Sequence, residues 1–328
     1  MRAVHSQPLQ HTLRDLDTAY RRAFNPKLTA HFPRFKKRGR PIGIHFPQKF
    51  RINGSSIYLP KIGWVGFRKS REIAGTPKNL TVSCQGDRWY IGIQTELEID
   101  EPVHTSNSAV GIDLGVARFA ALSDGSFIDG VNAFQKHRRR LAYYQRCMAR
   151  KVKFSSNWRK ARARVARLQR KIASLRNDML HKSTTTISKS HALVAMEDLR
   201  ITSMTASAKG TAEAPGTNVR AKSMLNRRIL DQGWGEFRRQ LDYKLKWTGG
   251  TLVLVDPRNT SRTCARCGYV SRDNRQSQTV FRCAACGYAA NADTNAAINI
   301  LRRAGQAQIA CGDSPMGESA KQEAQHVA

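Results

Sequence analysis

The sequence predicts an α/β protein with a small β-rich unit before its main domain and a cysteine-rich module near its end. Three observations predict this organisation. Short apolar runs at 191–200 and 250–257 are separated by long stretches of helical periodicity. Residues 42–99 instead hold short runs rich in β-branched and aromatic residues, divided by turn signals. Two CxxC pairs lie between positions 264 and 286. A chain of 328 residues is long enough for two or three packed units.

The first predicted elements are a helix and a small antiparallel β unit. Apolar residues recur at helical spacing and predict an amphipathic helix over about 7–25, within a helical region 1–30: Leu9, Leu13, Leu16, Tyr20 and Phe24. A basic connector, HFPRFKKRGRP, follows at 31–41. The β unit, placed at 31–106, is predicted to be a small sheet or barrel with turns at Asn53-Gly54 and at Gln85-Gly86-Asp87. Residues 101–108 read as a linker to the next unit.

The main domain is predicted over 107–260 and begins with AVGIDLGVARFAALSDGSFIDG, read as two strands joined by the Asp124-Gly125 turn. A basic helical hairpin is expected over 134–182, because the following residues are spaced alternately three and four apart: Trp158, Ala161, Val165, Leu168, Ile172, Leu175 and Met179. Residues 191–200 and 250–257 are buried strands, 205–218 a mobile loop, and 224–247 one helix. Residues 305–328 form a polar tail that is predicted to be disordered.

Charge restricts the class of partner. The chain has 56 Lys plus Arg against 24 Asp plus Glu, a formal net charge of +32, and a pI of about 10.7. Such an excess repels itself unless a polyanion is near, which favours nucleic acid first and an anionic membrane surface second. No apolar run approaches the length of a spanning helix, roughly 18 residues. The first residues, MRAVHSQPLQ, lack the apolar core of a signal peptide, so we expect a cytoplasmic protein without a membrane partner.

The paired cysteines predict a metal site. Cys264 and Cys267 form one CxxC pair and Cys283 and Cys286 a second, with fifteen residues between the pairs. Two such turns can direct four thiolates at one zinc ion in a tetrahedron, which leaves no open position and makes the zinc structural. Four ordinary buried cysteines are the less favoured interpretation. A catalytic dithiol is disfavoured because there are two pairs and no reactive setting for either.

Three carboxylates are weak indicators singly and a strong one together. Asp113 and Glu197 lie at the ends of apolar strands, and Asp293 at the start of a helix. Each alone is more readily a turn former, a surface residue or a helix cap. Three carboxylates on separate elements of one α/β unit can instead hold two hard divalent cations through oxygen. Such a metal pair catalyses phosphoryl displacement, which in a basic protein points to cleavage of a nucleic-acid backbone.

The order of these motifs resembles a known family. GIDLG at 111–115, VAMEDL at 194–199, the four-cysteine module and NADTNAAINIL at 291–301 are similar to the TnpB family, the OrfB proteins of insertion sequences, which are relatives of type V CRISPR effectors. LNRRILDQGWGEFRRQLDYKLKW and LVLVDPRNTSRTCARCG resemble the same family. The resemblance covers most of residues 1–304. The family usually begins with a further strand and more of a helical recognition region, so the N-terminus looks short.

The resemblance implies a fold, an activity and partners. It implies an RNase H-like (RuvC) nuclease domain with a zinc ribbon inserted at 261–290 and a closing helix at 291–304, preceded by the β-barrel and a helical remnant. Asp113, Glu197 and Asp293 match the family's catalytic triad, with magnesium as the metal. The implied function is that of a transposon-encoded RNA-guided DNA endonuclease, whose partners are a guide RNA and target DNA. No obligate protein partner is indicated. Asn291 departs from relatives that carry a second acid there.

The basic hairpin is the predicted nucleic-acid surface. Between Lys136 and Arg176 there are sixteen Lys plus Arg and no Asp or Glu, whereas a solvated helix face normally alternates in sign. Contact with backbone phosphates is therefore favoured over a merely solvated face. The candidate contacts are Arg138, Arg139, Arg140, Lys151, Lys153, Arg159, Lys160, Arg162 and Arg164.

Two other functions compete with the nuclease. A relative that binds RNA and DNA without cutting would act as a regulator or repressor of transposition, and it is expected to have lost a triad carboxylate. A transposase that joins DNA strands by itself through a tyrosine would need a histidine-rich metal pair, yet the nine histidines form no HxH pair. All three triad carboxylates are present, which favours the nuclease.

Overall fold

The structure is a computed structural model and describes residues 5–35, 43–85 and 88–310. The chain divides into two compact units. The first contains the residues up to Ile99 together with Arg162–Arg170, and the second contains the other described residues from Asp100 onward. The predicted turn residues Gly86 and Asp87, most of the basic connector and the tail beyond 310 lie outside the described residues. No helix within the described part of the chain is long and apolar enough to cross a membrane.

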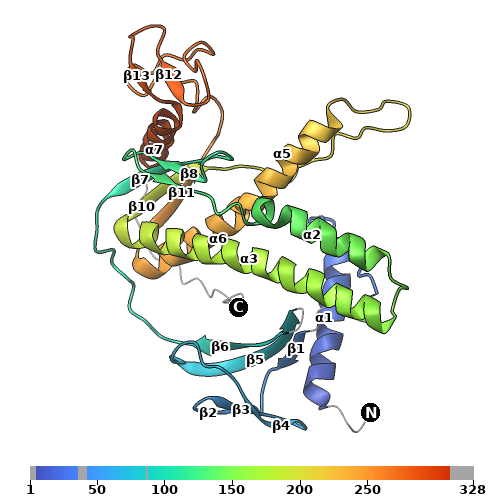
Figure 1. The fold of residues 1–328 in the computed structure, drawn as a ribbon. Helices are drawn as coiled ribbons and strands as arrows, with labels where there is room; N and C mark the ends of the chain where they lie inside the picture. Colours follow the sequence, from blue (N-terminus) through green and yellow to red (C-terminus); the bar gives the residue numbers. More distant parts are fainter. Residues whose placement is uncertain (1–4, 36–42, 86–87, 311–328) are drawn as a thin grey trace. The chain divides into compact units, whose positions relative to one another are not determined.

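The described residues up to Ile99 form one helix and two antiparallel sheets (Figure 1). The predicted amphipathic helix is α1 (Ser6–Phe24), whose first turn is capped by His5, which accepts a hydrogen bond from the Gln7 backbone N–H. One sheet has the order β1-β5-β6, with bounds Gly43–Phe46, Thr76–Gln85 and Arg88–Glu96. The other has the order β2-β3-β4, with bounds Arg51–Asn53, Ser56–Leu59 and Gly63–Gly66.

The two sheets share a core, but the described strands do not close into one barrel. Phe46 and Leu80 from the first sheet are buried with Ile57 and Leu59 from the second. Between Gly43 and Glu96, no hydrogen-bonded strand pair described by the structure joins the sheets, so barrel closure stays a prediction. The Asn53-Gly54 turn does connect β2 to β3, and Gly54 has a φ of 55°, a left-handed conformation that suits glycine.

The second unit is built on a five-stranded sheet with the order β11-β10-β7-β8-β9. The strands β7 (Ala109–Leu114), β8 (Ala120–Leu122) and β9 (Phe127–Ile128) are antiparallel neighbours. The strands β10 (Leu193–Glu197) and β11 (Thr251–Val255) run parallel to β7. The first segment thus forms three strands, not two. The extra turn lies at Gly115, whose N–H donates to the Phe119 carbonyl and whose Cβ, if present, would press on the Arg118 carbonyl oxygen.

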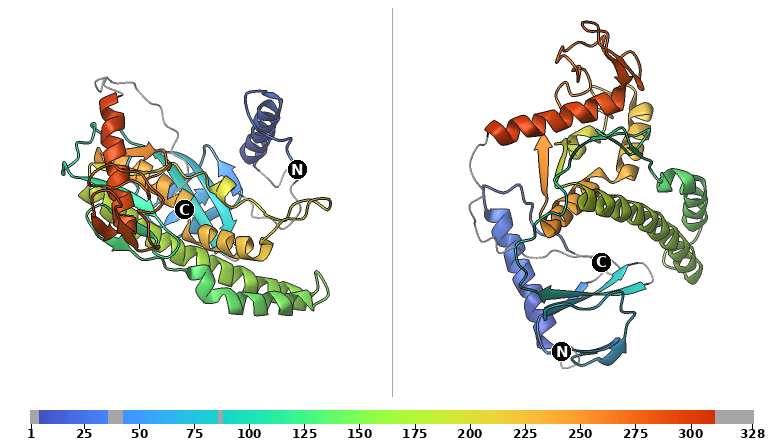
Figure 2. Two further views of the ribbon diagram at one scale, coloured as in Figure 1. Left: turned by 90° about the horizontal axis from the view of Figure 1, so that it is seen from above. Right: turned by 90° about the vertical axis from the view of Figure 1, so that its left-hand side faces the viewer.

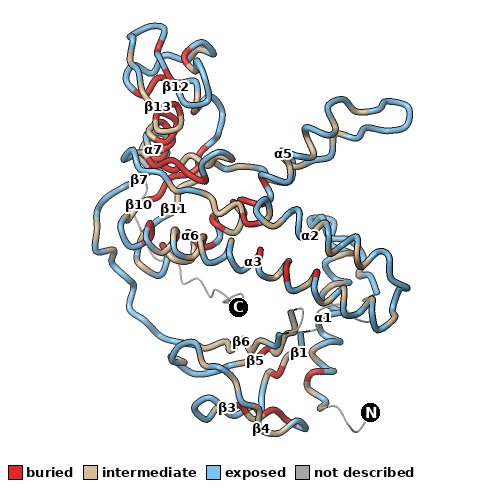
Figure 3. The backbone as a smooth tube through the Cα atoms, viewed as in Figure 1, coloured by how far each residue is buried: buried red, intermediate tan, exposed pale blue. Residues whose placement is uncertain are grey.

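Helices cover both faces of this sheet (Figures 1 and 2). Because side chains alternate along a strand, Val194 and Met196 of β10 enter one core and Ala195 the other. The larger core includes residues of α3 (Ser156–Ser190), α5 (Val219–Gln232) and α6 (Trp234–Thr248). The smaller core packs against α7 (Ala292–Ala310), which contacts β7, β10 and β11. Figure 3 shows the buried residues concentrated in the sheet and in α7.

Gly111 explains how α7 lies so close to the sheet. A Cβ at this position would collide with the Ala297 carbonyl oxygen and crowd the backbone of Leu301. The absence of a side chain therefore allows α7 to pack directly on β7, next to the strand end that carries Asp113.

Several predicted helix boundaries were wrong. The helix predicted at 224–247 is broken at Gly233, whose φ of 76° is left-handed and ends α5 before α6 begins. The hairpin consists of α2 (Ala133–Ala149) and α3, and α3 continues to Ser190, beyond the predicted 182. The last helix, α7, runs to Ala310, although 305–310 was assigned to a disordered tail. A four-residue helix, α4 (Ile201–Met204), also forms after β10.

The apolar face of α3 was predicted only in part. Val165, Leu168 and Ile172 are buried, whereas Leu175 is 37% exposed. Beyond that point Leu180 and Ile187 enter the main core instead. Alternating spacings of three and four follow a period of 3.5, whereas a straight helix has 3.6 residues per turn. The face therefore drifts by about 20° per heptad unless the helices supercoil.

Candidate metal centres

The four cysteines form a compact sulfur cluster. Their Sγ atoms all lie within 4.8 Å of one another. Cys264 Sγ is 3.7 Å from Cys286 Sγ, and Cys267 Sγ is 3.6 Å from Cys283 Sγ. A tetrahedral zinc site with Zn–S bonds of about 2.3 Å requires sulfur atoms about 3.8 Å apart. The donor set therefore fits a structural zinc ion in both number and spacing.

Each CxxC pair forms the same backbone turn. Gly268 N–H donates to the Cys264 carbonyl at 2.9 Å, and Gly287 N–H donates to the Cys283 carbonyl at 3.1 Å. Both glycines have left-handed φ angles, 78° and 70°. The Cys286 N–H also donates to Cys283 Sγ, and this backbone hydrogen bond is the main cause that lowers the pKa of the Cys283 thiol to about 7. At the second turn the hydrogen bond thus favours the thiolate form of Cys283, the form that binds metal. The pKa of Cys267, which a backbone hydrogen bond from Tyr269 lowers, is raised to about 12 by burial and by hydrogen bonds with the other thiols.

Three buried asparagines form hydrogen bonds within the ribbon and between the ribbon segment and α7. None of these asparagines was predicted from the sequence. Asn274 links the two cysteine turns, because its amide donates to the Arg262 and Tyr269 carbonyls and accepts from the Ala284 N–H. Asn295, on α7, accepts from the Ala265 N–H and donates to the Thr263 carbonyl. Asn299, one turn further, donates to the carbonyls of Thr260 and Thr263. The spacing of Asn295 and Asn299, four residues apart on a helix start, was the available signal.

The three carboxylates lie where two strands end and a helix begins. Asp113 and Glu197 lie near the carboxyl ends of β7 and β10, which are adjacent and parallel. Asp293 lies in the first turn of α7. Burial and, to a smaller extent, the negative charges of Glu197 and Asp293 together raise the pKa of Asp113 to about 7, against an opposing effect from Arg275. The charges of both other carboxylates therefore act on Asp113 through a region that water screens poorly.

The carboxylate cluster is wider than the sulfur cluster. Among the described residues, the cysteines are the metal-ligating group whose donor atoms all lie within 4.8 Å of one another. The three carboxylates do not approach one another this closely.

Two neighbours of the carboxylates had not been predicted. The Thr260 hydroxyl donates to Glu197 Oε1 at 2.5 Å, although burial still raises the pKa of Glu197. Arg275, which lies in the ribbon, pairs with Asp293 at 3.1 Å. Both residues come from the segment between β11 and α7. Asn291 acts as a helix cap, because its side-chain oxygen accepts from the N–H groups of Asp293 and Thr294.

Comparison with known proteins assigns the family. A family model described as "Probable transposase" (OrfB_IS605) matches residues 92–208, and the model "Cas12f1-like, TNB domain" matches residues 234–300. The chain is 52% identical over 321 residues to the putative RNA-guided DNA endonuclease InsQ of Escherichia coli K12, an alignment that covers 97% of this chain and 79% of InsQ. The chain belongs to the OrfB (TnpB) family.

Other similar proteins extend the comparison. A putative RNA-guided DNA endonuclease of Streptomyces pristinaespiralis is 33% identical, with 97% of this OrfB chain and 76% of the relative covered. The CRISPR-associated endodeoxyribonuclease Cas12f1 of Sulfoacidibacillus thermotolerans is 29% identical over 65% of this chain and 50% of its own. A solved Cas12f1–sgRNA–target DNA complex covers 91% of this chain and 85% of its own at 19% identity, with a TM-score of 0.40.

The predicted nucleic-acid contacts of this OrfB protein lie mainly on exposed positions of the basic hairpin. All nine candidates are exposed: Arg138, Arg139, Arg140, Lys151, Lys153, Arg159, Lys160, Arg162 and Arg164. Arg140 donates to the Tyr144 hydroxyl at 2.9 Å, and Arg162 already has an interaction within the chain. The other candidates present their cationic groups on the surface of α2, α3 and the turn between them.

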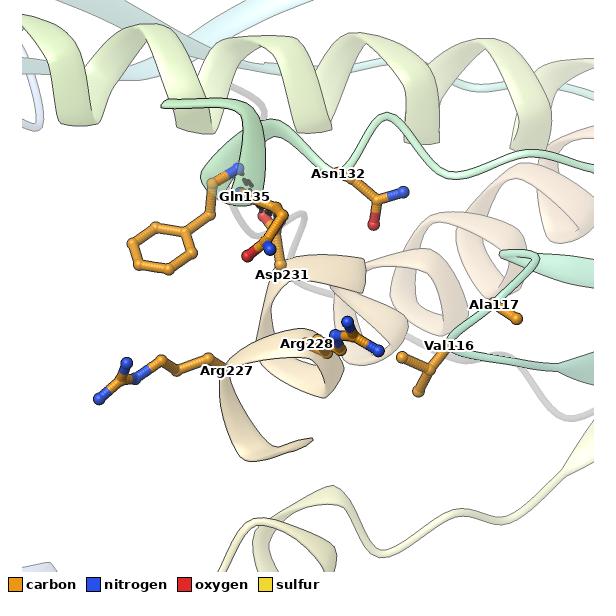
Figure 4. Close-up of a pocket in the computed structure, with 8 residues that line it drawn as sticks. Val116, Ala117, Asn132, Gln135, Arg227, Arg228 and Asp231 are labelled. Carbon is orange, nitrogen blue, oxygen red and sulfur yellow. Dashed lines mark hydrogen bonds between the residues drawn. The ribbon is translucent and has the colours of Figure 1, made fainter. Parts of the chain in front are cut away.

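A pocket of about 250 Å³ lies apart from these centres, between α5 and the start of α2 (Figure 4). Its lining includes none of the three carboxylates. Asp231 is buried there and its carboxylate accepts hydrogen bonds from the N–H groups of Phe134 and Gln135. Asp231 thereby caps α2 from another helix and pairs with Arg176 on α3 at 3.7 Å. The pocket is part of the joint between these helices.

Proposed function

We propose that this OrfB protein is a transposon-encoded, RNA-guided DNA endonuclease that hydrolyses phosphodiester bonds at Asp113, Glu197 and Asp293. The observation that carries the proposal is the placement of Asp113 and Glu197 near the carboxyl ends of adjacent parallel strands, with Asp293 in the first turn of the helix that packs on β7. The negative charges of Glu197 and Asp293 add to burial in raising the pKa of Asp113. Its support from relatives is the identity of 52% to InsQ, a putative RNA-guided DNA endonuclease. The proposed partners are a guide RNA and a target DNA.

The sheet topology supports an RNase H-like (RuvC) nuclease domain. In this fold, three antiparallel strands are followed by two strands parallel to the first, and here the order β11-β10-β7-β8-β9 follows that rule. We assign 107–260 to the nuclease domain, 261–290 to the inserted ribbon and the segment from 291 to its closing helix. The proposed β unit at 31–106 and the helical region at 1–30 precede it.

The carboxylates provide the hard oxygen donors that magnesium prefers. Asp113, Glu197 and Asp293 would hold the ions, since they bring negative charge into a region where burial already raises the pKa of Asp113. When bound, a magnesium pair would stabilise the attacking and leaving oxygens of the phosphoryl displacement. Because metal ligands must be deprotonated, loading the site would release the proton that Asp113 holds near pH 7.

Other residues of the chain complete the site. Thr260 orients the Glu197 carboxylate through its hydrogen bond, and Arg275 holds Asp293 through its ion pair. Arg275 lies in the ribbon and Thr260 directly before it, so the proposed zinc site at Cys264, Cys267, Cys283 and Cys286 would fix the position of groups that contact the carboxylates. The exposed cations of the α2–α3 hairpin supply sequence-independent phosphate contacts.

The test is cleavage by the purified protein with co-expressed RNA from the flanks of its gene. A plasmid carrying the matched target should be cut in magnesium and remain intact in chelator. Asp113→Asn should abolish cutting while RNA binding is kept. The matched control is Asp124→Asn, an exposed carboxylate at the β8–β9 turn of the same sheet, which should cut normally. Normal cutting by Asp113→Asn would exclude the assigned site.

A further inference from the structure

The turn between α2 and α3 presents apolar side chains to solvent. Val152 is 79% exposed and Phe154 is 64% exposed. The turn is well ordered by its own hydrogen bonds, since the Ser155 N–H donates to the Val152 carbonyl at 3.1 Å. The Ser155 hydroxyl then accepts from the Trp158 N–H and caps α3. Figures 1 and 2 show α2 and α3 side by side, joined by this turn.

Phe154 has an unusual backbone conformation. Its φ is 71°, in the left-handed region that disfavours bulky residues. Within the described residues, the other non-glycine positions with positive φ are occupied by Lys49, Lys61 and three asparagines. An aromatic residue that is held in this conformation and exposed to solvent contributes little to the stability of the fold. Such strain is typical of a position kept for binding.

The Phe154 ring is held in place rather than free to rotate into the protein. Trp158, one turn into α3, meets it in an edge-type contact with ring centroids 5.4 Å apart. The amino group of Lys153 lies 5.3 Å from the centre of the same ring. The contact with Trp158 and the cation–π contact fix the orientation of the ring while leaving most of its surface open.

The charges around the turn identify the partner. Arg150, Lys151, Lys153, Arg159 and Lys160 are all exposed around Phe154. No acidic residue occurs between Lys136 and Arg176. An apolar protein surface would not require this density of positive charge, whereas a nucleic acid has both flat base faces and phosphates. An exposed ring surrounded only by cations therefore matches a base together with its flanking backbone.

We propose that Phe154, with Val152 beside it, stacks on an exposed nucleobase while Lys151, Lys153, Arg159 and Lys160 bind the neighbouring phosphates. Exposed base faces occur at the end of a duplex and in single strands. The hairpin would thus mark where the bound duplex ends, in addition to contacting its backbone. The inference rests on the proposed function only in requiring that the chain binds nucleic acid.

The test measures binding of the full chain to three probes at one salt concentration. The probes are a short RNA–DNA heteroduplex with open ends, the same duplex with both ends closed by loops, and the single DNA strand. 2-Aminopurine replaces the terminal base in the open duplex and a central base in a second copy. Fluorescence of the terminal analogue should be quenched by the wild-type protein, and that of the central analogue should not change.

Phe154→Ala should weaken binding to the open duplex and the single strand by about five-fold to a hundred-fold, which is the range of base–aromatic stacking. Binding to the closed duplex should be unchanged, and quenching of the terminal analogue should disappear. Phe154→Trp should restore the binding to open ends and the quenching of the terminal analogue. Tyr143→Ala removes another exposed aromatic side chain of the same hairpin, on α2, and should leave the terminal quenching intact.

Phe154→Gly separates binding from folding. Glycine accepts the left-handed conformation, so the thermal midpoint should equal or exceed that of the wild type, while binding to open ends is weakened as in Phe154→Ala. Equal binding of wild type and Phe154→Ala to every probe would overturn the proposal and leave a protein as the occupant of the turn. Equal losses on open and closed duplexes, with a lowered midpoint, would show a structural role instead. A wild-type chain that binds none of the probes would contradict the proposed function itself.

Discussion

The two candidate metal centres differ in how their ligands are brought together. The four cysteines come from one segment of 23 residues, Cys264 to Cys286, and their sulfur atoms already lie within 4.8 Å of one another. The carboxylates come from two strands and a helix, separated by long stretches of sequence, and remain wider apart. Local backbone hydrogen bonds, such as that from the Cys286 N–H to Cys283 Sγ, help to arrange the thiols within this short segment. Carboxylates in a buried region repel one another.

The comparison teaches that one centre is local and the other depends on the fold. We expect the ribbon to become ordered through the proposed zinc ion and the asparagine contacts. The carboxylate site needs the sheet and α7 to be assembled first. The following experiments test this difference.

Removing one zinc ligand should have the largest effect on the local centre. Cys283→Ser should lose about one zinc per chain and unfold the ribbon, because structural zinc in small sites contributes roughly 10–16 kcal/mol of apparent binding energy. Hydrogen exchange should show loss of protection in β12 (Val280–Arg282) and β13 (Ala289–Asn291), with protection of β7 and β10 retained. Cys147→Ser on α2 is the matched control and should keep its zinc. Simultaneous unfolding of ribbon and sheet would contradict the view that the ribbon is a separate local unit.

Neutralising the buried carboxylate should stabilise the metal-free fold. The pKa of Asp113 rises from 3.8 to about 7 on folding, so the unfolded chain gives up its proton first. Stability should therefore fall as pH rises from about 4 to about 7, by up to about 4 kcal/mol. Asp113→Asn should remove this fall, which denaturant unfolding in magnesium-free buffer at a series of pH values would measure.

The control for this pH dependence is Asp124. Burial tends to raise the pKa of Asp124. Hydrogen bonds from the Ser126 side chain and backbone outweigh this effect and lower the pKa below its ordinary value of 3.8. Asp124 thus contributes stability above that value and loses it in acid, the opposite sign to Asp113. Asp124→Asn should leave the fall between pH 4 and 7 in place. An identical pH profile for wild type and Asp113→Asn would mean that folding does not raise the pKa of Asp113.

The joint between the two centres should respond to loss of one asparagine. Asn299 is 4% exposed and donates to two carbonyls of the segment that leads into the ribbon. Asn299→Ala should cost about 2–3 kcal/mol, the sum of two hydrogen bonds lost at buried groups. Denaturant unfolding measures the loss, and Gln276→Ala, at an exposed ribbon position, should cost less than about 0.5 kcal/mol. A loss for Asn299→Ala no larger than for Gln276→Ala would mean that α7 does not hold the ribbon through this contact.

The smallest expected effect concerns the phosphate contacts. Replacing Arg138, Arg139 and Arg164 with glutamine should reduce the slope of log affinity against log salt by about 2–3 units if each contacts one phosphate. Matched and mismatched targets should be affected alike, because phosphate contacts carry no sequence information. The control replaces Arg21, Lys182 and Lys246, each already paired with an aspartate four residues before it. Equal salt slopes for both triple variants would mean that these hairpin cations are solvated and do not contact phosphates.

Local sequence patterns predicted where helices form better than they predicted which helix faces are buried. The periodicity of Leu9 to Phe24 predicted α1 within one residue at each end, yet Leu13 and Phe24 are 66% and 69% exposed. The same kind of pattern in α3 predicted three buried residues and then failed at Leu175. Periodicity reports which residues share a face, but the neighbouring element decides whether that face is covered. Gly233 shows a second limit, because a glycine within a helical pattern can either be tolerated or end the helix.

The sequence by itself determined what depends on short spacing. It determined the cysteine turns, the presence of the apolar strands that precede Asp113 and Glu197, the helix that begins near Asp293, and the excess of positive charge on the hairpin. The tertiary structure decided which distant groups meet. It placed Asp113 among two other negative charges, Thr260 on Glu197, Arg275 on Asp293, and three buried asparagines across the ribbon. These contacts have no local pattern, because their geometry arises from strand pairing and from the close approach of α7 that Gly111 permits.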